Sequence, residues 1–210
     1  VKNIDKDRKA IIIKETRKSY RYYMIADSIF NIYNELAAIS ILRIIGLSAT
    51  KINNSIKKTK IVETRINEEE IAGKKVITHL SKGQNPVAAS RVFDYVQSKP
   101  GKKAIILIID DCDDAKYSSE NLTWLYDADF ELLNKEDIKQ IIIGGVRAND
   151  YYLRLLFAGV PEERLIKTVN ELETTKFIDK DNIDTIFILH DIYKYDVALK
   201  LKQNLKEDKE

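Results

Sequence analysis

Apolar and polar residues follow each other along this chain in blocks that predict strands and helices in alternation. Five short runs are apolar at nearly every position, which is typical of buried parallel strands. The segments between them carry apolar residues at helical spacing. The predicted strands are 75–80, 104–109, 140–143, 164–166 and 185–189, and the predicted helices are 86–98, 128–133, 148–158, 169–177 and 192–205. This order predicts an α/β fold, with a Rossmann-like, mostly parallel sheet and helices on both faces.

The first 58 residues follow a different pattern. Two strand-like runs, 10–14 and 20–25, are joined by a polar turn and predict a hairpin. A helix is predicted over 29–45, ended by Gly46. Its predicted apolar face consists of Ile29, Ile32, Tyr33, Leu36, Ala37, Ile41 and Ile44. A shorter helix is predicted over 49–58, and the charged stretch 59–72 is assigned at most a short strand at 61–64.

Composition excludes several functional classes. Lys and Arg number 35 against 33 Asp and Glu, and the net charge of +2 gives no support to nucleic-acid binding. The single cysteine, Cys112, excludes an internal disulfide and a cysteine-rich zinc site, and fits a reducing compartment. No apolar run approaches the roughly 18 residues that a bilayer requires, and no signal peptide is present. We therefore expect a cytoplasmic protein without a transmembrane segment.

The loop 81–86 joins a predicted strand to a predicted helix. Asn85 stands at the N-cap position and Pro86 at the first helical position, where its missing N–H costs nothing. The same helix start could hold an anion through its free N–H groups. Capping alone and contact with a phosphate or substrate both remain open.

An acidic run follows the predicted strand 104–109. Its residues are Asp110, Asp111, Cys112, Asp113 and Asp114. Ligands of α/β sheets bind at the carboxyl ends of strands, so these carboxylates are candidates for Mg²⁺, for positioning a substrate or a partner, or for a solvated loop. Because no regular metal-ligand spacing is present, no metal-binding residue is assigned.

Aromatic and acidic residues follow in the next loop, where Trp124 is the only tryptophan. A lone Trp near a Tyr is typical of core packing or of a contact surface. Arg147, after the Gly144-Gly145 turn, could pair with Asp127 or Asp129.

Three other polar signals are local. His79 and His190 end predicted strands without a convincing partner, and are interpreted as surface or hydrogen-bonded histidines. Thr168 with Glu171 three residues later predicts a capping box.

Three motifs in order carry a family resemblance. They are FNIYNELAA at 30–38, Asn85-Pro86, and WLYDADFE at 124–131 followed by a GxRA turn at 145–148. Together they resemble the end of the central domain and the C-terminal domain of MurT, a Mur-ligase-like subunit. In that family MurT works with a glutaminase called GatD and amidates the second-position glutamate of the lipid II stem peptide. The resemblance implies that residues 1–58 are the tail of a Mur ligase central domain, and that 59–210 are a MurT-type C-terminal domain.

The resemblance also implies activity, cofactors and partners. The expected activity is ATP-dependent amide formation, with ATP and Mg²⁺ bound by the full-length subunit and with a GatD-like class I glutaminase and lipid II as partner and substrate. No glycine-rich phosphate loop occurs in this chain, so we expect it to bind no ATP by itself and to be inactive alone.

The family's site residues transfer only in part. An aspartate three residues before the tryptophan is thought to complete the glutaminase's cysteine–histidine site, whereas Asn121 stands there in this chain, after Glu120, and the D-G-R-D motif is missing. The catalytic candidates are Asp110, Asp111, Glu120 and Asn121. The candidates for substrate or partner binding are Asn85, Trp124, Tyr126, Asp127, Asp129 and Arg147.

The altered loop favours a second hypothesis of another class. The chain would then be a non-catalytic, Rossmann-like binding or scaffold domain that docks a glutaminase or another protein. Because the chain lacks an initiator methionine, it is expected to be a C-terminal fragment.

Overall fold

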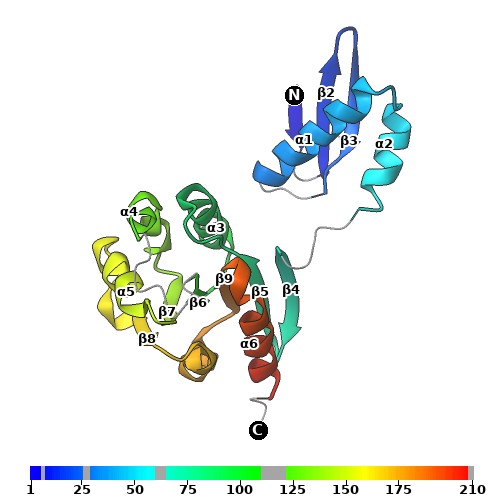
Figure 1. The fold of residues 1–210 in the computed structure, drawn as a ribbon. Coiled ribbons are helices and arrows are strands. Elements are labelled where there is room, and N and C mark those ends of the chain that lie inside the picture. The colour runs from blue at the N-terminus through cyan, green and yellow to red at the C-terminus, as the bar shows by residue number, and fades with distance from the viewer. Residues whose placement is uncertain (6–7, 26–28, 60–64, 110–121, 208–210) are drawn as a thin grey trace. The chain divides into compact units, whose positions relative to one another are not determined.

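The computed structural model describes residues 1–5, 8–25, 29–59, 65–109 and 122–207 (Figure 1). The chain divides into two compact units, Val1–Val62 and Glu63–Glu210. Each unit has its own sheet and its own buried apolar residues.

The first unit combines an antiparallel sheet, in the order β1-β2-β3, with two helices. The β2–β3 pairing, from Ala10↔Tyr23 to Glu15↔Lys18, forms the predicted hairpin. Both predicted helices are present. The elements are β1 (Asn3–Asp5), β2 (Ala10–Glu15), β3 (Lys18–Tyr23), α1 (Ile29–Ile44) and α2 (Ala49–Ile56).

Helix α1 buries only part of the predicted apolar face. Ile32 and Ile39 are buried, as is Glu35 between them, because the small sheet of this unit covers only one side of the helix. Glu35 accepts a hydrogen bond from the Ile25 N–H at 3.2 Å, and burial raises the pKa of its carboxyl group. Much of the predicted apolar face is exposed instead: Tyr33 by 64%, Ile41 by 60% and Ile44 by 83%.

The second unit is built on a six-stranded sheet in the order β4-β5-β9-β6-β7-β8. Every neighbouring pair is parallel except β4 and β5. The predicted α/β class and mostly parallel sheet are therefore confirmed. The strands are β4 (Ile66–Ile71), β5 (Lys74–Leu80), β6 (Lys103–Ile108), β7 (Ile138–Gly144), β8 (Leu165–Thr168) and β9 (Thr185–His190).

Strand β4 was not predicted, because its sequence INEEEI reads as a charged connection. It lies at the edge of the sheet, where one side of a strand stays solvated and charged residues are common. Ala72 and Gly73, both with positive φ, form the tight turn to β5. The short strand considered at 61–64 lies outside the described residues.

Helices pack on both faces of this sheet, as predicted. Strand β6 illustrates the alternation: Ile105 and Leu107 contact the core beneath α3, α4 and α5, whereas Ile106 and Ile108 contact the core beneath α6 (Figure 1). The helices are α3 (Pro86–Ser98), α4 (Trp124–Asp127), α5 (Ala148–Phe157) and α6 (Tyr195–Glu207), and the 3-10 helices are η1 (Phe130–Leu133), η2 (Glu162–Arg164), η3 (Glu171–Phe177), η4 (Lys180–Asn182) and η5 (Ile192–Lys194).

Several predicted helices differ in detail. Of the helix expected over 128–133 the structure has only the 3-10 helix η1, preceded by the unpredicted short helix α4, and the helix expected over 169–177 is the 3-10 helix η3. The predicted capping box at Thr168 is wrong. Asn170 caps η3 by accepting from the Leu172 N–H at 3.1 Å, and Thr168 instead accepts from the Asn170 N–H at 3.2 Å. Thr168 is the last residue of β8 and therefore lies too early to cap this helix.

Candidate functional site

Loops that follow β5, β7 and β9 meet at the carboxyl edge of the parallel sheet, where α/β folds bind their ligands. The loop after β5 leads into α3, whose first residue is Pro86. The Asn85 side chain accepts a hydrogen bond from the Ala88 N–H at 3.0 Å. The predicted capping role of Asn85 is therefore confirmed, and the helix start lies at the ligand-binding edge.

A buried aspartate ties two of these loops together. Asp191, which directly follows β9, is 3% exposed. One of its carboxylate oxygens accepts from the Gly83 N–H at 2.7 Å and the other from the Tyr193 N–H at 3.2 Å. These bonds hold the loop after β5 against the start of η5. Sequence reasoning missed Asp191, although an Asp at a strand end before a helical turn is a recognisable capping signal.

Ser81 lies in the same loop and is fully buried. Its backbone N–H donates to the His190 carbonyl oxygen at 2.8 Å. Among the described residues its hydroxyl group has no hydrogen-bond partner. A buried hydroxyl without a partner is uncommon in native proteins, which distinguishes this loop from an ordinary connection.

Both histidines are hydrogen-bonded, as predicted, but His190 is buried and not at the surface. Nδ1 of His79 lies 3.0 Å from the Leu80 carbonyl oxygen, and Nδ1 of His190 lies 2.8 Å from the Asp191 carbonyl oxygen. Because a carbonyl only accepts, each Nδ1 carries the proton. Burial lowers the pKa of His79 to about 4, and it also lowers the pKa of His190. Both imidazoles are therefore neutral at physiological pH.

The four catalytic candidates, Asp110, Asp111, Glu120 and Asn121, lie outside the described residues, as do Cys112, Asp113 and Asp114. Strand β6, which precedes these residues in the chain, ends at Ile108 on the same carboxyl edge. Within the ranges that the structure describes, no three His, Cys, Asp or Glu side chains gather so as to hold a metal ion.

Trp124 is a core residue and not a surface contact. It is the first residue of α4, not part of a loop, and it is 6% exposed. Its ring meets that of Tyr151 edge-on, with centroids 6.2 Å apart. The Nε1 hydrogen is buried and has no partner among the described residues. Of the two alternatives left by the sequence, the structure supports core packing.

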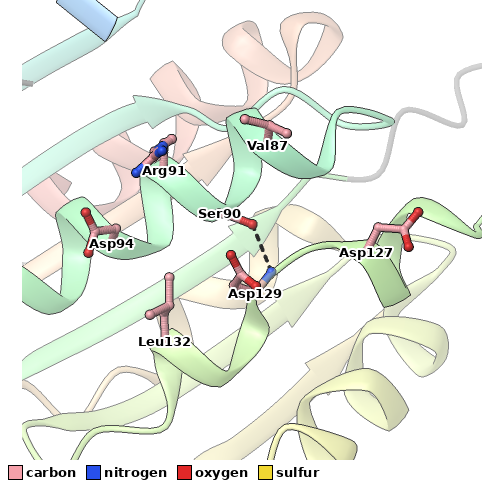
Figure 2. Close-up of a pocket in the computed structure, with 7 residues that line it drawn as sticks. All are labelled: Val87, Ser90, Arg91, Asp94, Asp127, Asp129 and Leu132. Atoms are coloured by element: carbon pink, nitrogen blue, oxygen red, sulfur yellow. Dashed lines mark hydrogen bonds between the residues drawn. The ribbon is translucent and has the colours of Figure 1, made fainter. Parts of the chain in front are cut away.

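The residues next to Trp124 do reach the surface. Tyr126 is 60% exposed, and Asp127 and Asp129 are exposed as well. Asp127 and Asp129 border a shallow groove of about 350 Å³ between α3 and the α4–η1 segment (Figure 2). The Ser90 hydroxyl on α3 accepts a hydrogen bond from the Asp129 N–H at 2.9 Å, which joins the two walls. The groove is lined by Val87, Ser90, Arg91, Asp94, Asp127, Asp129 and Leu132.

Arg147 is placed differently from the prediction. It stands at the N-cap of α5 and forms an ion pair with Asp150, one turn along that helix, at 3.8 Å. The predicted pairs with Asp127 or Asp129 are not among the described ion pairs. Helical spacing explains the outcome, because residues three apart on a helix are neighbours.

A buried arginine that sequence reasoning missed supports α4 and η1 from below. Arg154 on α5 is 5% exposed. Its guanidinium donates to the carbonyl oxygens of Leu125 and Ala128, at 2.8 and 2.9 Å, and to both carboxylate oxygens of Glu131, at 2.9 and 3.0 Å. The only sequence signal was an arginine on the otherwise apolar face of a helix, beside Tyr151 and Leu155.

None of the described helices is both long enough and apolar enough to cross a membrane.

Residues 80–205 match the family model described as MurT ligase C-terminal. The lipid II isoglutaminyl synthase (glutamine-hydrolyzing) subunit MurT of Streptococcus pneumoniae is 30% identical over 162 residues, which are 77% of this chain and 35% of that protein. The same subunit from Staphylococcus aureus (strain COL) is 30% identical over 150 residues, 71% of this chain and 33% of that protein. The chain thus spans about a third of the length of these curated relatives.

Solved structures share the fold at low sequence identity. MurF from Acinetobacter baumannii superposes with a TM-score of 0.66 at 14% identity, over 92% of this chain and 42% of its own. A pseudomurein peptide ligase type C from Methanothermus fervidus gives a TM-score of 0.63 at 16% identity, over 95% of this chain and 40% of its own. MurF from Thermotoga maritima, solved in complex with ADP, gives a TM-score of 0.59 at 13% identity, over 90% of this chain and 42% of its own. On the family match and the two relatives, the chain belongs to the MurT ligase C-terminal family.

Proposed function

We propose that this chain is the C-terminal part of an ATP-dependent amide ligase subunit that amidates the glutamate of the lipid II stem peptide. The ammonia would come from a GatD-like class I glutaminase partner. Membership of the MurT ligase C-terminal family supports the proposal, as do relatives that are named glutamine-hydrolyzing lipid II isoglutaminyl synthase subunits.

The reaction proceeds in three balanced steps. The partner hydrolyses glutamine to glutamate and ammonia. ATP transfers its terminal phosphoryl group to the glutamate α-carboxylate of lipid II, which yields ADP and an acyl phosphate. Ammonia then attacks the acyl carbon, and inorganic phosphate leaves as the amide forms. ATP and Mg²⁺ are assigned to the rest of the full-length subunit, because this chain has no glycine-rich phosphate loop.

Residues of this chain would contribute at the carboxyl edge of the sheet. The start of α3, capped by Asn85, presents backbone N–H groups that favour an anionic substrate. Asp191 holds the preceding loop in place through the Gly83 N–H. Arg147, at the start of α5, adds positive charge at the same edge. These groups would orient the acyl phosphate and do not themselves supply the nucleophile.

The glutaminase would dock on the surface of the α4–η1 segment. Tyr126, Asp127 and Asp129 are exposed on the short α4–η1 segment. Their exposure is the main structural support for the docking proposal. Tyrosine is enriched at interface hot spots. Trp124 supports this surface from beneath. Asp110, Asp111, Glu120 and Asn121 are the residues proposed to reach the partner's active site, with Glu120 or a loop aspartate in the role of the family's aspartate.

We assign residues 1–58 to the tail of a Mur ligase central domain and 59–210 to the C-terminal domain. The exposed stripe of Tyr33, Ile41 and Ile44 on α1 supports this assignment, because an apolar stripe of this kind normally packs against other protein. The rest of a central domain would cover it.

Binding of this chain to the glutaminase encoded with it tests the docking proposal. We expect Tyr126→Ala and Asp127→Asn to weaken binding in titration calorimetry, while Leu199→Ala serves as a control. Leu199 is 43% exposed and lies on α6, on the opposite face of the sheet. Equal affinity for all three variants would remove the docking role of α4–η1.

The replacement of the family's aspartate by Asn121 favours a second candidate, a scaffold domain that docks the glutaminase without completing its active site. Glu120→Gln separates the two. The ligase proposal expects glutamine hydrolysis in the complex to fall, and the scaffold proposal expects no change.

A further inference from the structure

The α4–η1 segment has little structure of its own to hold it in place. Helix α4 has four residues and η1 has four. Helices this short are not stable alone, since isolated helices need about 12 residues or more. The position of the exposed residues on this segment therefore depends on contacts with the rest of the fold.

Arg154 supplies several of those contacts from a single side chain. From α5 it reaches Leu125 in α4, Ala128 between the two helices, and Glu131 in η1. One side chain thus bonds to all three parts of the segment. Its guanidinium also lies over the Phe130 ring, with 5.2 Å between the central carbon and the ring centroid.

The geometry of these bonds requires an arginine. Nε and one terminal nitrogen donate in different directions, to two backbone carbonyls and to both oxygens of one carboxylate. A lysine ammonium is a single point donor and cannot span these acceptors at the same time. A buried charge would also be costly here without such partners.

We propose that Arg154 is a positioning residue that fixes the α4–η1 segment, and with it Tyr126, Asp127 and Asp129, in the arrangement that a protein partner binds. This inference rests on the proposed function, which names the glutaminase as that partner. Arg154 itself is buried and acts only through the segment above it. The Ser90–Asp129 hydrogen bond holds the segment from the side of α3 and completes the support.

The chain carries its own reporter of this arrangement. Trp124, the only tryptophan, begins α4 and is buried next to Tyr151 on α5. We expect Arg154→Lys to shift Trp124 emission to longer wavelength in the folded chain and to speed amide hydrogen exchange over 125–133. Glu131→Gln, which keeps the size of the side chain and removes its charge, is expected to have the same effect to a smaller extent.

Lys202→Met is the matched control. Lys202 is also a buried cation, 6% exposed, with Asn67 at 2.7 Å and Glu69 as partners, but it lies on α6 on the other face of the sheet. The Lys202→Met substitution is expected to lower the melting temperature while leaving Trp124 emission unchanged. Comparison with this variant separates loss of local position from loss of overall stability.

Affinity for the glutaminase decides the inference. We expect Arg154→Lys to weaken binding at least tenfold, and Lys202→Met to leave the affinity of the folded chain within twofold of the parent. Arg154→Lys and Glu131→Gln variants that are folded and bind like the parent would overturn the positioning role. If the parent chain fails to bind the glutaminase, the proposed function fails instead. If the parent chain does not bind, Trp124 emission tests the role of Arg154 by itself. Unchanged emission in Arg154→Lys would overturn the positioning role, and a shift to longer wavelength would support the conclusion that Arg154 positions the α4–η1 segment.

Discussion

Acid should destabilise the second unit at a pH where most carboxylates are still ionised, because this unit holds two histidines neutral, His190 buried and His79 partly buried. His79 packs against the Tyr95 ring, with centroids 5.3 Å apart, and burial lowers its pKa to about 4. In an unfolded chain the pKa of a histidine is about 6.5. Between these values the unfolded state binds a proton that the folded state does not, so stability falls as the pH falls.

The size of the effect follows from the two pKa values. His79 alone is expected to remove about 2 kcal/mol of unfolding free energy between pH 7.5 and pH 5, and about 3 kcal/mol by pH 4. The pKa of His190 is also lowered, and this histidine acts in the same direction. The stability that the neutral histidines provide is complete above pH 6.5.

Urea unfolding followed by Trp124 fluorescence measures this directly, because Trp124 lies in the core of the second unit. In His79→Gln the slope of the unfolding free energy against pH should be smaller than in the parent protein. In the double variant His79→Gln/His190→Gln this slope should be close to zero between pH 5 and 7. Slopes are compared, not absolute values, because both substitutions also change packing. A parent protein equally stable at pH 5 and pH 7.5, or a double variant with the parent's slope, would refute the reasoning.

Three further substitutions test the packing of the site. Gly144→Ala should lower the unfolding free energy by about 1–3 kcal/mol in chemical denaturation, because the added Cβ would lie 2.8 Å from Thr174 Cγ2 and 3.1 Å from the Glu171 Cα. An unchanged denaturation midpoint would mean that η3 can shift freely. Asn85→Ala should cost about 1 kcal/mol in thermal unfolding while Asn85→Asp retains the cap, and equal losses for both would contradict the capping role. Trp124→Ala should lower the unfolding free energy, measured by circular dichroism melting, by about 3–5 kcal/mol, whereas Tyr126→Ala should change it by less than about 0.5 kcal/mol. The reverse order would place the tryptophan at the surface.

The parallel strands were predictable because burial on both faces leaves a direct mark on the sequence. The run AIILI of β6 is apolar at every position, and all of β6 is buried. Strand β4 left no such mark, since an edge strand with the sequence INEEEI can keep its charges in solvent. Patterning identified the strands that are buried on both faces and missed this charged edge strand.

The candidate site was predictable at capping positions and not in its buried polar contacts. Asn85 before Pro86 identifies a helix start from local chemistry alone. Arg154 bonds to residues 23 to 29 positions away, and Asp191 accepts from the Gly83 N–H 108 positions away; no local pattern encodes contacts over such separations. Trp124 shows the same limit, because its burial depends on α5 packing over it.

Product formation by the reconstituted complex tests the central claim most directly. The full-length subunit proposed to contain this chain is incubated with the proposed glutaminase partner, ATP, Mg²⁺, glutamine and lipid II, and the stem peptide is analysed by mass spectrometry. We predict that the glutamate α-carboxylate is converted to the amide only when ATP, glutamine and both proteins are present, with inorganic phosphate released in equal amount. Unmodified lipid II from a folded, ATP-binding complex would contradict the account.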